Sequence, residues 1–385
     1  LGTGAGAPSS SVAEELVKRG HRVIVYTSSR GYDEPSIKYP GRETIRGVTV
    51  RRVPLSSFGK SSILVRLAGG FSFVAQSIAR AVTSRKIDAV LISTSPPLAP
   101  LAALTLGALR GAKVKYWVMD INPDQIVALG MANPGSASVR AFDWLNRRIL
   151  ARADDIIVLD RFMAERMSAK RDVTGRMTIL PPWPAEDPEE IVEHEENPFR
   201  AEHVATGRTV LMYSGNHGPS NPLTTILQAA KRLEDEKKLL FMFVGGGVGK
   251  ADVEAAAGPN IVSLPYQPLS GLTNSLSAAD VHIVTVGDQV AGIVHPSKVY
   301  GAMAVGRPIL LVGPRENHVA DILAEYDIGW HVLHGDVDGA VRVLREIAAM
   351  SREDLAAKGR LARAVMIARG GKAGSVSRMA DVVER

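Results

Sequence analysis

The segment HPSKVYGAMAVGRP, residues 295–308, predicts a short helix with a signal at each end. Pro296 suits the first helical position, because the N–H that proline lacks would have no partner there. Gly306 can adopt the left-handed conformation that closes a helix, and Pro308 prevents the helix from continuing. The apolar run Ile309–Val312 follows immediately and predicts a buried strand. The segment therefore indicates a helix inside an alternating α/β pattern.

Ser297 and Lys298 occupy the first turn of this predicted helix. Free backbone N–H groups, a hydroxyl and an ammonium group at a helix start would together suit a phosphate. The alternative is that Ser297 only caps the helix and that Lys298 is only solvated. A motif this short does not decide between the two.

The composition is that of a folded chain with two or three domains. The chain has 385 residues, of which 45% are hydrophobic and 22% are charged. It contains no cysteine, which excludes disulfides and thiolate metal sites and fits a reducing cytosol. The histidines are scattered except for His331 and His334, which lie in a predicted turn, so we expect no metal site.

The longest uncharged apolar run, Ala89–Leu109, is long enough to span a bilayer. Pro96, Pro97 and Pro100 interrupt it. We therefore interpret it as a buried strand, a proline-rich loop and a buried helix.

Charge is distributed unevenly between the two halves. Residues 1–180 contain 26 Lys and Arg against 14 Asp and Glu, a net charge of +12, and the remainder carries −6. This asymmetry predicts that the first half binds an anionic partner. A membrane fits better than nucleic acid, because the basic residues are dispersed and aromatic residues are few. We expect a cytoplasmic protein, peripheral at the inner face of the plasma membrane.

The helical stretch Ser57–Lys86 is basic and amphipathic, so it either faces the core or lies on that membrane. The residues expected on the membrane face are Lys60, Arg66, Arg80, Arg85 and Lys86, with Phe71 or Phe73 as an apolar wedge.

A glycine-rich loop with Gly2, Gly4 and Gly6 precedes a predicted helix, Ser9–Arg19. Such a loop allows close backbone approach to a ligand and is similar to the dinucleotide-binding fingerprint, and Arg30 would then suit a 2′-phosphate. That fingerprint requires a strand before the loop, so we expect a first strand to precede residue 1. A simple tight turn is the alternative.

Strands and helices alternate through residues 1–180, which predicts a parallel sheet with helices on both faces. Residues 28–46 are polar and rich in Gly, Pro and Arg, which predicts a loop there. Ligands of such sheets bind beyond the carboxyl ends of the strands. Asp120 follows the strand Val114–Met119, so it is a candidate site residue, with a capping or loop carboxylate as the alternative.

A proline-rich and acidic stretch, residues 181–206, predicts a linker. A second α/β domain follows over residues 207–365. Within it we expect a helix that Ser220 or Asn221 caps and that ends near Lys238, and a strand at Ile261–Leu264. Residues 366–385 are expected to form a C-terminal helix that packs back on the first domain, after a break near Gly370.

In the second domain, loops that could contact a ligand follow three of the predicted strands. Gly215-Asn216 and Gly245-Gly246 follow two predicted strands and precede helices, and Tyr266-Gln267 follows a third. Because these loops meet the helix at Ser297 and Lys298 along one edge of the sheet, they favour a nucleotide diphosphate site.

The chain resembles the retaining family-four glycosyltransferases of GT-B fold, in the branch that builds bacterial surface polysaccharides of the colanic-acid and O-antigen type. The resemblance covers nearly the whole chain. It rests on Gly4–Pro8, Asp120 with Pro123, Tyr213–Asn216, Val244–Gly247, Leu264–Tyr266 and Pro296–Pro308.

The resemblance implies an α/β fold of two Rossmann-like parallel-sheet domains facing a central cleft. It implies sugar transfer with retention from a nucleotide-diphospho sugar to a lipid-linked or saccharide acceptor, without a metal or other cofactor. Asp120 and Lys298 would be catalytic. The implied donor-binding residues are Gly215, Asn216, Gly245, Gly246, Tyr266, Gln267, Ser297, Lys298 and Tyr300; Gly4, Gly6, Asp120 and Glu316 would contact the acceptor or sugar.

The chain departs from the family pattern at two places. Ile293 and Gly301 stand where the family has glutamates, and Asn216 and Asn221 stand where it has Arg and Lys. The alternatives are a nucleotide-sugar 2-epimerase of the same fold, an NADP-dependent oxidoreductase, or a binding protein without catalytic activity.

Overall fold

The computed structural model describes residues 6–30, 37–54, 63–84, 86–185, 187–188 and 190–385. The chain divides into two compact units. Unit 1 comprises Leu1–Pro181 with Ser375–Arg385, and unit 2 comprises Pro182–Gly374.

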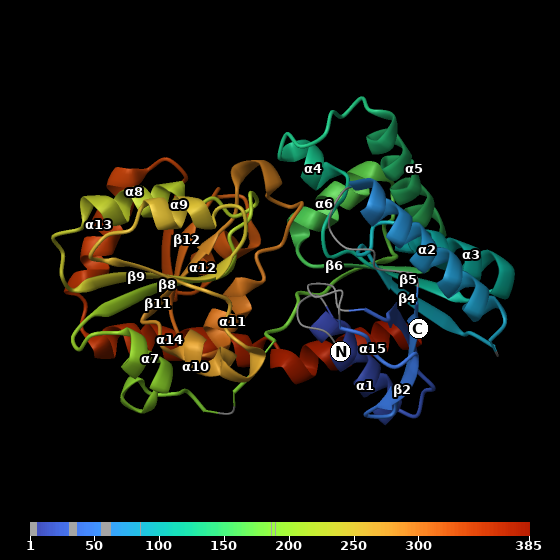
Figure 1. The fold of residues 1–385 in the computed structure, drawn as a ribbon, viewed down its shortest axis with the longest axis horizontal. Helices are drawn as coiled ribbons and strands as arrows, with labels where there is room; N and C mark the ends of the chain where they lie inside the picture. Colours follow the sequence, from blue (N-terminus) through green and yellow to red (C-terminus); the bar gives the residue numbers. More distant parts are fainter. Residues whose placement is uncertain (1–5, 31–36, 55–62, 85, 186, 189) are drawn as a thin grey trace. The chain divides into compact units, whose positions relative to one another are not determined.

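Unit 2 contains a six-stranded sheet in which every strand pair is parallel (Figure 1). The strand order is β10-β9-β8-β11-β12-β13, the doubly wound arrangement in which the chain reverses its direction of travel between β8 and β11. The strands are β8 (Thr209–Asn216), β9 (Leu239–Gly246), β10 (Ile261–Leu264), β11 (Val281–Thr285), β12 (Ile309–Val312) and β13 (Gly329–Val332).

Helices cover both faces of this sheet, as the near-continuous apolar strands require (Figure 1). One face buries side chains such as Leu211 and Phe241 beneath α8 (Thr224–Arg232), α9 (Lys250–Ala255) and α13 (Val337–Ala349). The other buries Met212 and Met242 near α7 (Pro198–His203). The remaining helices of this unit are α10 (Leu272–Ser277), α11 (Lys298–Ala304), α12 (His318–Glu325) and α14 (Arg352–Ala368), with short 3₁₀ turns η1 (His194–Glu196), η2 (Leu269–Gly271) and η3 (Asp288–Val290).

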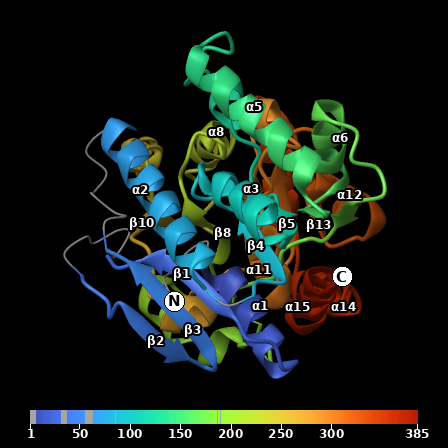
Figure 2. The ribbon, with the colours of Figure 1, turned by 90° about the vertical axis from the view of Figure 1, so that its right-hand side faces the viewer.

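Unit 1 contains a parallel sheet in the order β4-β5-β6-β7 and a three-stranded sheet in the order β1-β3-β2. Helices α2 and α3 lie side by side over this unit in both views (Figures 1 and 2). The strands are β1 (Ile24–Ser28), β2 (Arg42–Ile45), β3 (Val48–Val53), β4 (Ala89–Ser93), β5 (Lys113–Trp117), β6 (Asp155–Val158) and β7 (Met177–Ile179). The helices are α1 (Gly6–Lys18), α2 (Ile63–Val82), α3 (Ala99–Arg110), α4 (Asp124–Ala128), α5 (Ala137–Arg152) and α6 (Arg161–Lys170).

Helix α15 (Gly371–Glu384) supplies the C-terminal residues of unit 1. Arg19, just beyond α1, donates to Asp381 at 2.7 Å, to Glu384 at 2.8 Å and to the Ser377 hydroxyl at 2.7 Å. Glu384 also contacts the His21 ring at 2.7 Å. The last turns of the chain are thus joined to its first helix.

The apolar run at residues 89–109 forms β4 and α3, as its prolines predicted. Among the helices of the described residues, none has the length and apolarity needed to cross a membrane.

Three local predictions were wrong. Residues 28–46 were expected to be a loop, but β2 lies within them as a short antiparallel partner of β3. Pro296 was expected to be the first helical residue, but α11 begins at Lys298. Helix α8 was expected to carry a Ser220 or Asn221 cap and to end near Lys238; it begins at Thr224 without a side-chain cap and ends at Arg232, after which the chain turns into β9.

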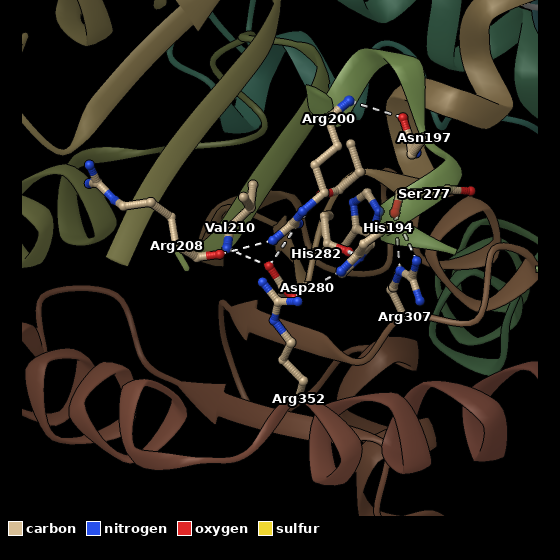
Figure 3. Close-up of polar contacts among 12 residues, drawn as sticks. His194, Asn197, Arg200, Arg208, Val210, Ser277, Asp280, His282, Arg307 and Arg352 are labelled. Carbon is tan, nitrogen blue, oxygen red and sulfur yellow. Dashed lines mark hydrogen bonds and ion pairs between the residues drawn. The ribbon is translucent and has the colours of Figure 1, made fainter. Parts of the chain in front are cut away.

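The segment predicted as a linker, residues 181–206, contains η1 and α7 and is fixed to unit 2 by buried polar contacts (Figure 3). Arg200 donates to Asp280 at 2.9 Å and to the Ala278 carbonyl at 2.5 Å. His194 contacts the Ala279 carbonyl at 3.2 Å and Asp280 at 3.5 Å.

These contacts satisfy the carbonyls at the carboxyl end of α10, which lack partners within the helix. Arg307 donates twice to the Ser277 carbonyl, at 2.9 and 3.2 Å, and once to Val192 at 3.0 Å. His282 contacts the Leu276 carbonyl at 2.9 Å. Cationic and N–H groups suit this helix end because the dipole there is negative.

Candidate functional site

The reversal of strand order in unit 2 places a ligand site beyond the carboxyl ends of β8 and β11. Gly215 and Asn216 form the end of β8, and Lys298 begins the first helix after β11. The structure therefore brings the predicted residues of two distant segments to the same edge of the sheet.

Lys298 lies directly across the end of β8. A Cβ atom added at Gly215 would lie 2.6 Å from Lys298 Cε, so a larger residue at this position would force the Lys298 side chain to move. The Lys298 ammonium lies 3.5 Å from Asn221 Oδ1 and 5.1 Å from the centre of the Tyr213 ring. Burial lowers the pKa of Lys298 to about 8. Among the described residues no carboxylate forms an ion pair with it.

The glycines at the ends of β8 and β9 allow an unusually close approach of the two backbones. Gly215 has φ +133° and Gly245 has φ +136°, a region that side chains rarely adopt. A Cβ atom at Gly245 would lie 2.1 Å from the Gly215 carbonyl oxygen, and one at Gly247 would lie 2.4 Å from Asn216 Oδ1. Glycine at these positions therefore allows the ends of β8 and β9 to lie as close together as they do.

Tyr266 covers the end of β9. Its hydroxyl donates to the Gly246 carbonyl at 3.1 Å, and its ring lies close to Gly246, yet 60% of the residue remains exposed. Gln267 turns back and donates to the Pro265 carbonyl at 3.1 Å. An exposed aromatic face beside a glycine loop can stack on a flat ligand.

A cavity of about 250 Å³ adjoins the Lys298 position and shares Asn221 with it. The loops after β8 and β9 and the first turn of α8 form its wall. The lining residues are His217, Gly218, Pro219, Asn221, Pro222, Leu223, Thr224, Leu227, Val248, Gly249 and Asp252.

Three other residues of this unit were predicted to belong to the site, and none of them has a hydrogen bond to Lys298 in the structure as described: Ser297, Tyr300 and Glu316. Ser297 is exposed and makes no capping hydrogen bond. Tyr300 is buried, and its hydroxyl is 3.0 Å from Nε2 of His295. Glu316 is exposed in the loop after β12.

In unit 1, Asp120 lies just beyond the carboxyl end of β5, as predicted. Its backbone N–H donates to the Thr94 hydroxyl at 3.3 Å, which ties it to the end of β4. Burial raises the pKa of Asp120 to about 6, and its carboxylate forms no ion pair within the described part of the chain. Gly6 begins α1, whereas Gly4 lies outside the described residues.

Sequence reasoning missed the two groups that frame the Lys298 ammonium. Asn221 had a signal, since it stands at a position where the family has a cation. Tyr213 was named only within the segment Tyr213–Asn216 of the resemblance and was given no role, because an aromatic residue at the end of an apolar strand is ordinarily part of the core.

Residues 3–183 match the model of the glycosyl transferase 4-like domain. The chain is 29% identical over 310 residues to the probable glycosyltransferase WbjE of Pseudomonas aeruginosa, covering 79% of this chain and 75% of the relative. It is 28% identical over 326 residues to the candidate colanic acid biosynthesis glycosyl transferase WcaI of Escherichia coli, covering 79% and 78%.

Solved structures with the same fold extend over essentially the whole chain. Sucrose-phosphate synthase from Thermosynechococcus elongatus superposes with a TM-score of 0.78 at 13% identity, covering 99% of this chain and 93% of that one. WaaG, a glycosyltransferase of lipopolysaccharide biosynthesis, gives 0.68 at 16% identity, covering 100% and 97%. HepE of Anabaena, solved with UDP-glucose, gives 0.69 at 13% identity, covering 100% and 97%.

These comparisons confirm the expected fold and do not favour the epimerase or oxidoreductase alternatives. The match of residues 3–183, the two relatives aligned over 79% of this chain and the shared fold all refer to glycosyltransferases. The chain has the GT-B fold of these solved structures, and its residues 3–183 match the glycosyl transferase 4-like domain.

Proposed function

We propose that this chain transfers a sugar, with retention of configuration, from a nucleoside-diphosphate sugar to a saccharide or lipid-linked acceptor in the assembly of a bacterial surface polysaccharide. The observation that carries the proposal is the Lys298 ammonium, which lies across Gly215 at the carboxyl edge of the unit 2 sheet and has no carboxylate partner in the described part of the chain.

The donor diphosphate is the partner that Lys298 lacks. A buried cation is costly unless it is paired, and a dianionic diphosphate at the end of β8 would supply the missing charge. HepE, which shares this fold, has been solved with UDP-glucose. Tyr266, Gln267, Gly246 and the edge around Asn216 would then contact the rest of the nucleotide sugar, with Ser297 exposed beside the phosphates.

Catalysis in this proposal depends on stabilising the leaving group. As the bond from the sugar to the diphosphate breaks, negative charge grows on the phosphate oxygens and Lys298 stabilises it. The departing diphosphate would accept the proton of the acceptor hydroxyl, so neither a protein nucleophile nor a metal ion is needed. Asp120 would position the acceptor or support the positive charge on the sugar, with Gly6 and Glu316 near the acceptor or sugar.

The acceptor class follows from the relatives and from the charge of the chain. WcaI is named for colanic acid and WaaG for lipopolysaccharide, both of which are saccharide products. The net +12 of residues 1–180 would hold the first half against an anionic membrane carrying a lipid-linked acceptor, at its cytoplasmic face.

A thermal-shift panel tests the donor assignment. UDP, GDP and dTDP, each alone and as its glucose conjugate, should include at least one ligand that raises the Tm, because a ligand bound only to the folded state stabilises it. NADPH serves as the control and should leave the Tm unchanged. Stabilisation by NADPH and by none of the diphosphates would contradict the proposal.

A further inference from the structure

Three buried rings stack on one another beside α11. The His295 and His318 rings lie 3.6 Å apart between centroids and are tilted by 17°. Tyr300 lies 6.0 Å from His318 at 23° and donates or accepts a 3.0 Å hydrogen bond with His295. Each residue is at most 7% exposed. We refer to His295, Tyr300 and His318 as the ring stack.

The ring stack joins two loops at the ligand edge of unit 2. His295 precedes α11 and Tyr300 lies within it, whereas His318 is the first residue of α12. The Asn317 side chain accepts hydrogen bonds from Val319 and Ala320 at 2.9 and 3.1 Å, which fixes the backbone that carries His318. The stack therefore attaches the start of α11 to a firmly capped neighbour.

Helix α11 has no side-chain cap at its amino end among the described residues. Ser297, its N-cap residue, makes no side-chain hydrogen bond to the helix. A helix of seven residues without a cap has little stability of its own, so its orientation is set by packing. The ring stack provides that packing.

Lys298 and Tyr300 are two residues apart and so project from nearly opposite sides of the helix. The ring stack holds the side of α11 turned toward α12, and Lys298 extends from the other side across Gly215. The Lys298 side chain packs closely on Gly215, and its ammonium lies 3.5 Å from Asn221 Oδ1. A small rotation of α11 would therefore change both contacts.

Burial, aided by the nearby His295 and Arg369, holds the pKa of His318 well below its usual range. A neutral His318 ring can stack closely on His295 without the repulsion of two imidazolium charges.

We propose that His295, Tyr300 and His318 are positioning residues for Lys298, and that the ring stack sets the affinity for the donor diphosphate without touching it. This inference rests on the proposed function, and it gives Tyr300 an indirect role in place of the direct donor contact that the sequence predicted.

The test is a double-mutant cycle on the full chain, with Kd measured by calorimetry for the best-binding diphosphate among UDP, GDP and dTDP. Tyr300→Phe keeps the ring and removes one hydrogen bond, so Kd should rise about 3- to 10-fold. In a Lys298→Met background the same change should alter Kd less than about twofold, because the group being positioned is gone. Tyr326→Phe, at a half-buried tyrosine beyond α12, is the matched control and should change nothing.

A second pair of variants separates positioning from folding. His318→Ala removes the ring that stacks on His295, so it should weaken binding and raise the donor KM more than it lowers kcat. His318→Phe preserves stacking and should restore most of the affinity. An equal effect of Tyr300→Phe in both backgrounds, or failure of His318→Phe to improve on His318→Ala while both remain folded by urea titration, would overturn the inference alone. Absence of diphosphate binding by the unmutated chain would contradict the proposed function and the inference with it.

Discussion

Two cations of unit 2, the buried Arg200 and the half-buried Lys298, lie at opposite edges of one sheet, and their surroundings differ. Arg200, at the amino edge, is 6% exposed and meets Asp280, the Ala278 carbonyl and the Arg208 carbonyl, the last at 2.9 Å (Figure 3). Lys298, at the carboxyl edge, meets one amide oxygen at 3.5 Å and the face of a tyrosine.

The difference separates a structural charge from one kept for a ligand. Both cations lose hydration on burial, which is costly for each of them. Around Arg200 the fold replaces that hydration with a carboxylate and carbonyls, so breaking the set would leave a buried charge unpaired. Around Lys298 it does not, and the depressed pKa of Lys298 records the remaining cost.

The largest effect, on the free energy of unfolding, is expected at the amino edge, where Arg200 is paired with Asp280. Asp280→Ala leaves Arg200 without its carboxylate and should lower the free energy of unfolding by about 3–5 kcal/mol, measured by urea titration. Arg352→Ala is the matched control, because its ion pair with Glu195 is exposed at 3.3 Å, and it should cost less than about 1 kcal/mol. Equal losses in the two variants would remove the distinction between the edges.

At the carboxyl edge, removal of the charge of Lys298 should change ligand binding instead of stability. Lys298→Met removes a charge-assisted contact worth about 1.5–3 kcal/mol, so diphosphate affinity should fall roughly 10- to 100-fold by calorimetry. The unliganded variant should be as stable as the parent chain at pH 7 or more so, since the cost of burying the ammonium is gone. Unchanged affinity for every diphosphate would rule out Lys298 as the phosphate ligand.

The pH dependence has a definite sign. The folded pKa of Lys298, about 8, is lower than its unfolded value, so the unfolded chain holds more protons between the two. The destabilisation by Lys298 is therefore complete at pH values below 8 and is relieved as pH rises through 8 toward 10. Diphosphate affinity of the parent chain should decline over the same rise, and Lys298→Met should not show that decline.

Asp120 extends the comparison to unit 1, where its half-buried carboxylate likewise forms no ion pair with any residue that the structure describes. Asp120→Asn should reduce turnover by about tenfold or more while changing diphosphate affinity less than about twofold. Because burial raises its pKa to about 6, the ionised carboxylate destabilises the fold above that pH, and Asn should raise the Tm at pH 7.5. Full turnover with a genuine acceptor would return Asp120 to a purely structural role.

The smallest effect is expected from exposed charges of unit 1. Each cation near an anionic membrane adds about 1 kcal/mol at most, and Lys86 is already paired with Asp88 at 2.8 Å. Phe71, 64% exposed on α2, is the wedge candidate; Lys60, Arg85 and the side chain of Arg66 lie outside the described residues.

Liposome co-sedimentation measures this effect. The chain should pellet weakly with anionic vesicles at low salt and be released at high salt, because screening shortens the reach of exposed charges. Phe71→Ser should reduce the pelleted fraction. Equal recovery with neutral vesicles would leave the charge asymmetry of the chain unexplained.

The sequence predicted elements well where the signal was local. Strands β10 and β12 have the residues expected, because each is a short apolar run bounded by turn signals. The end of α11 was also correct, since Gly306 has φ +65°. Strand β2 was missed because Arg42–Ile45 is polar and half exposed, and only its pairing with β3 makes it a strand.

The site was predicted in outline but not in its contacts. Gly215 and Lys298 were each identified from helix and loop patterns, but their packing depends on strand order, which no local pattern contains. Tyr300 was assigned to the donor because it lies near Lys298 in sequence; the structure turns its side chain toward His295 and His318. Partners of Arg200 were not foreseen, since residues 181–206 have the composition of a linker.

The contacts of Arg19 with α15 bear on how the chain is made. Asp381 is translated 362 residues after Arg19. At about 5–20 residues per second, synthesis of the intervening unit 2 takes roughly 10–40 s. During that time the surface beside α1 lacks α15, so nascent unit 1 is incomplete and remains open to chaperone binding until α15 has been translated.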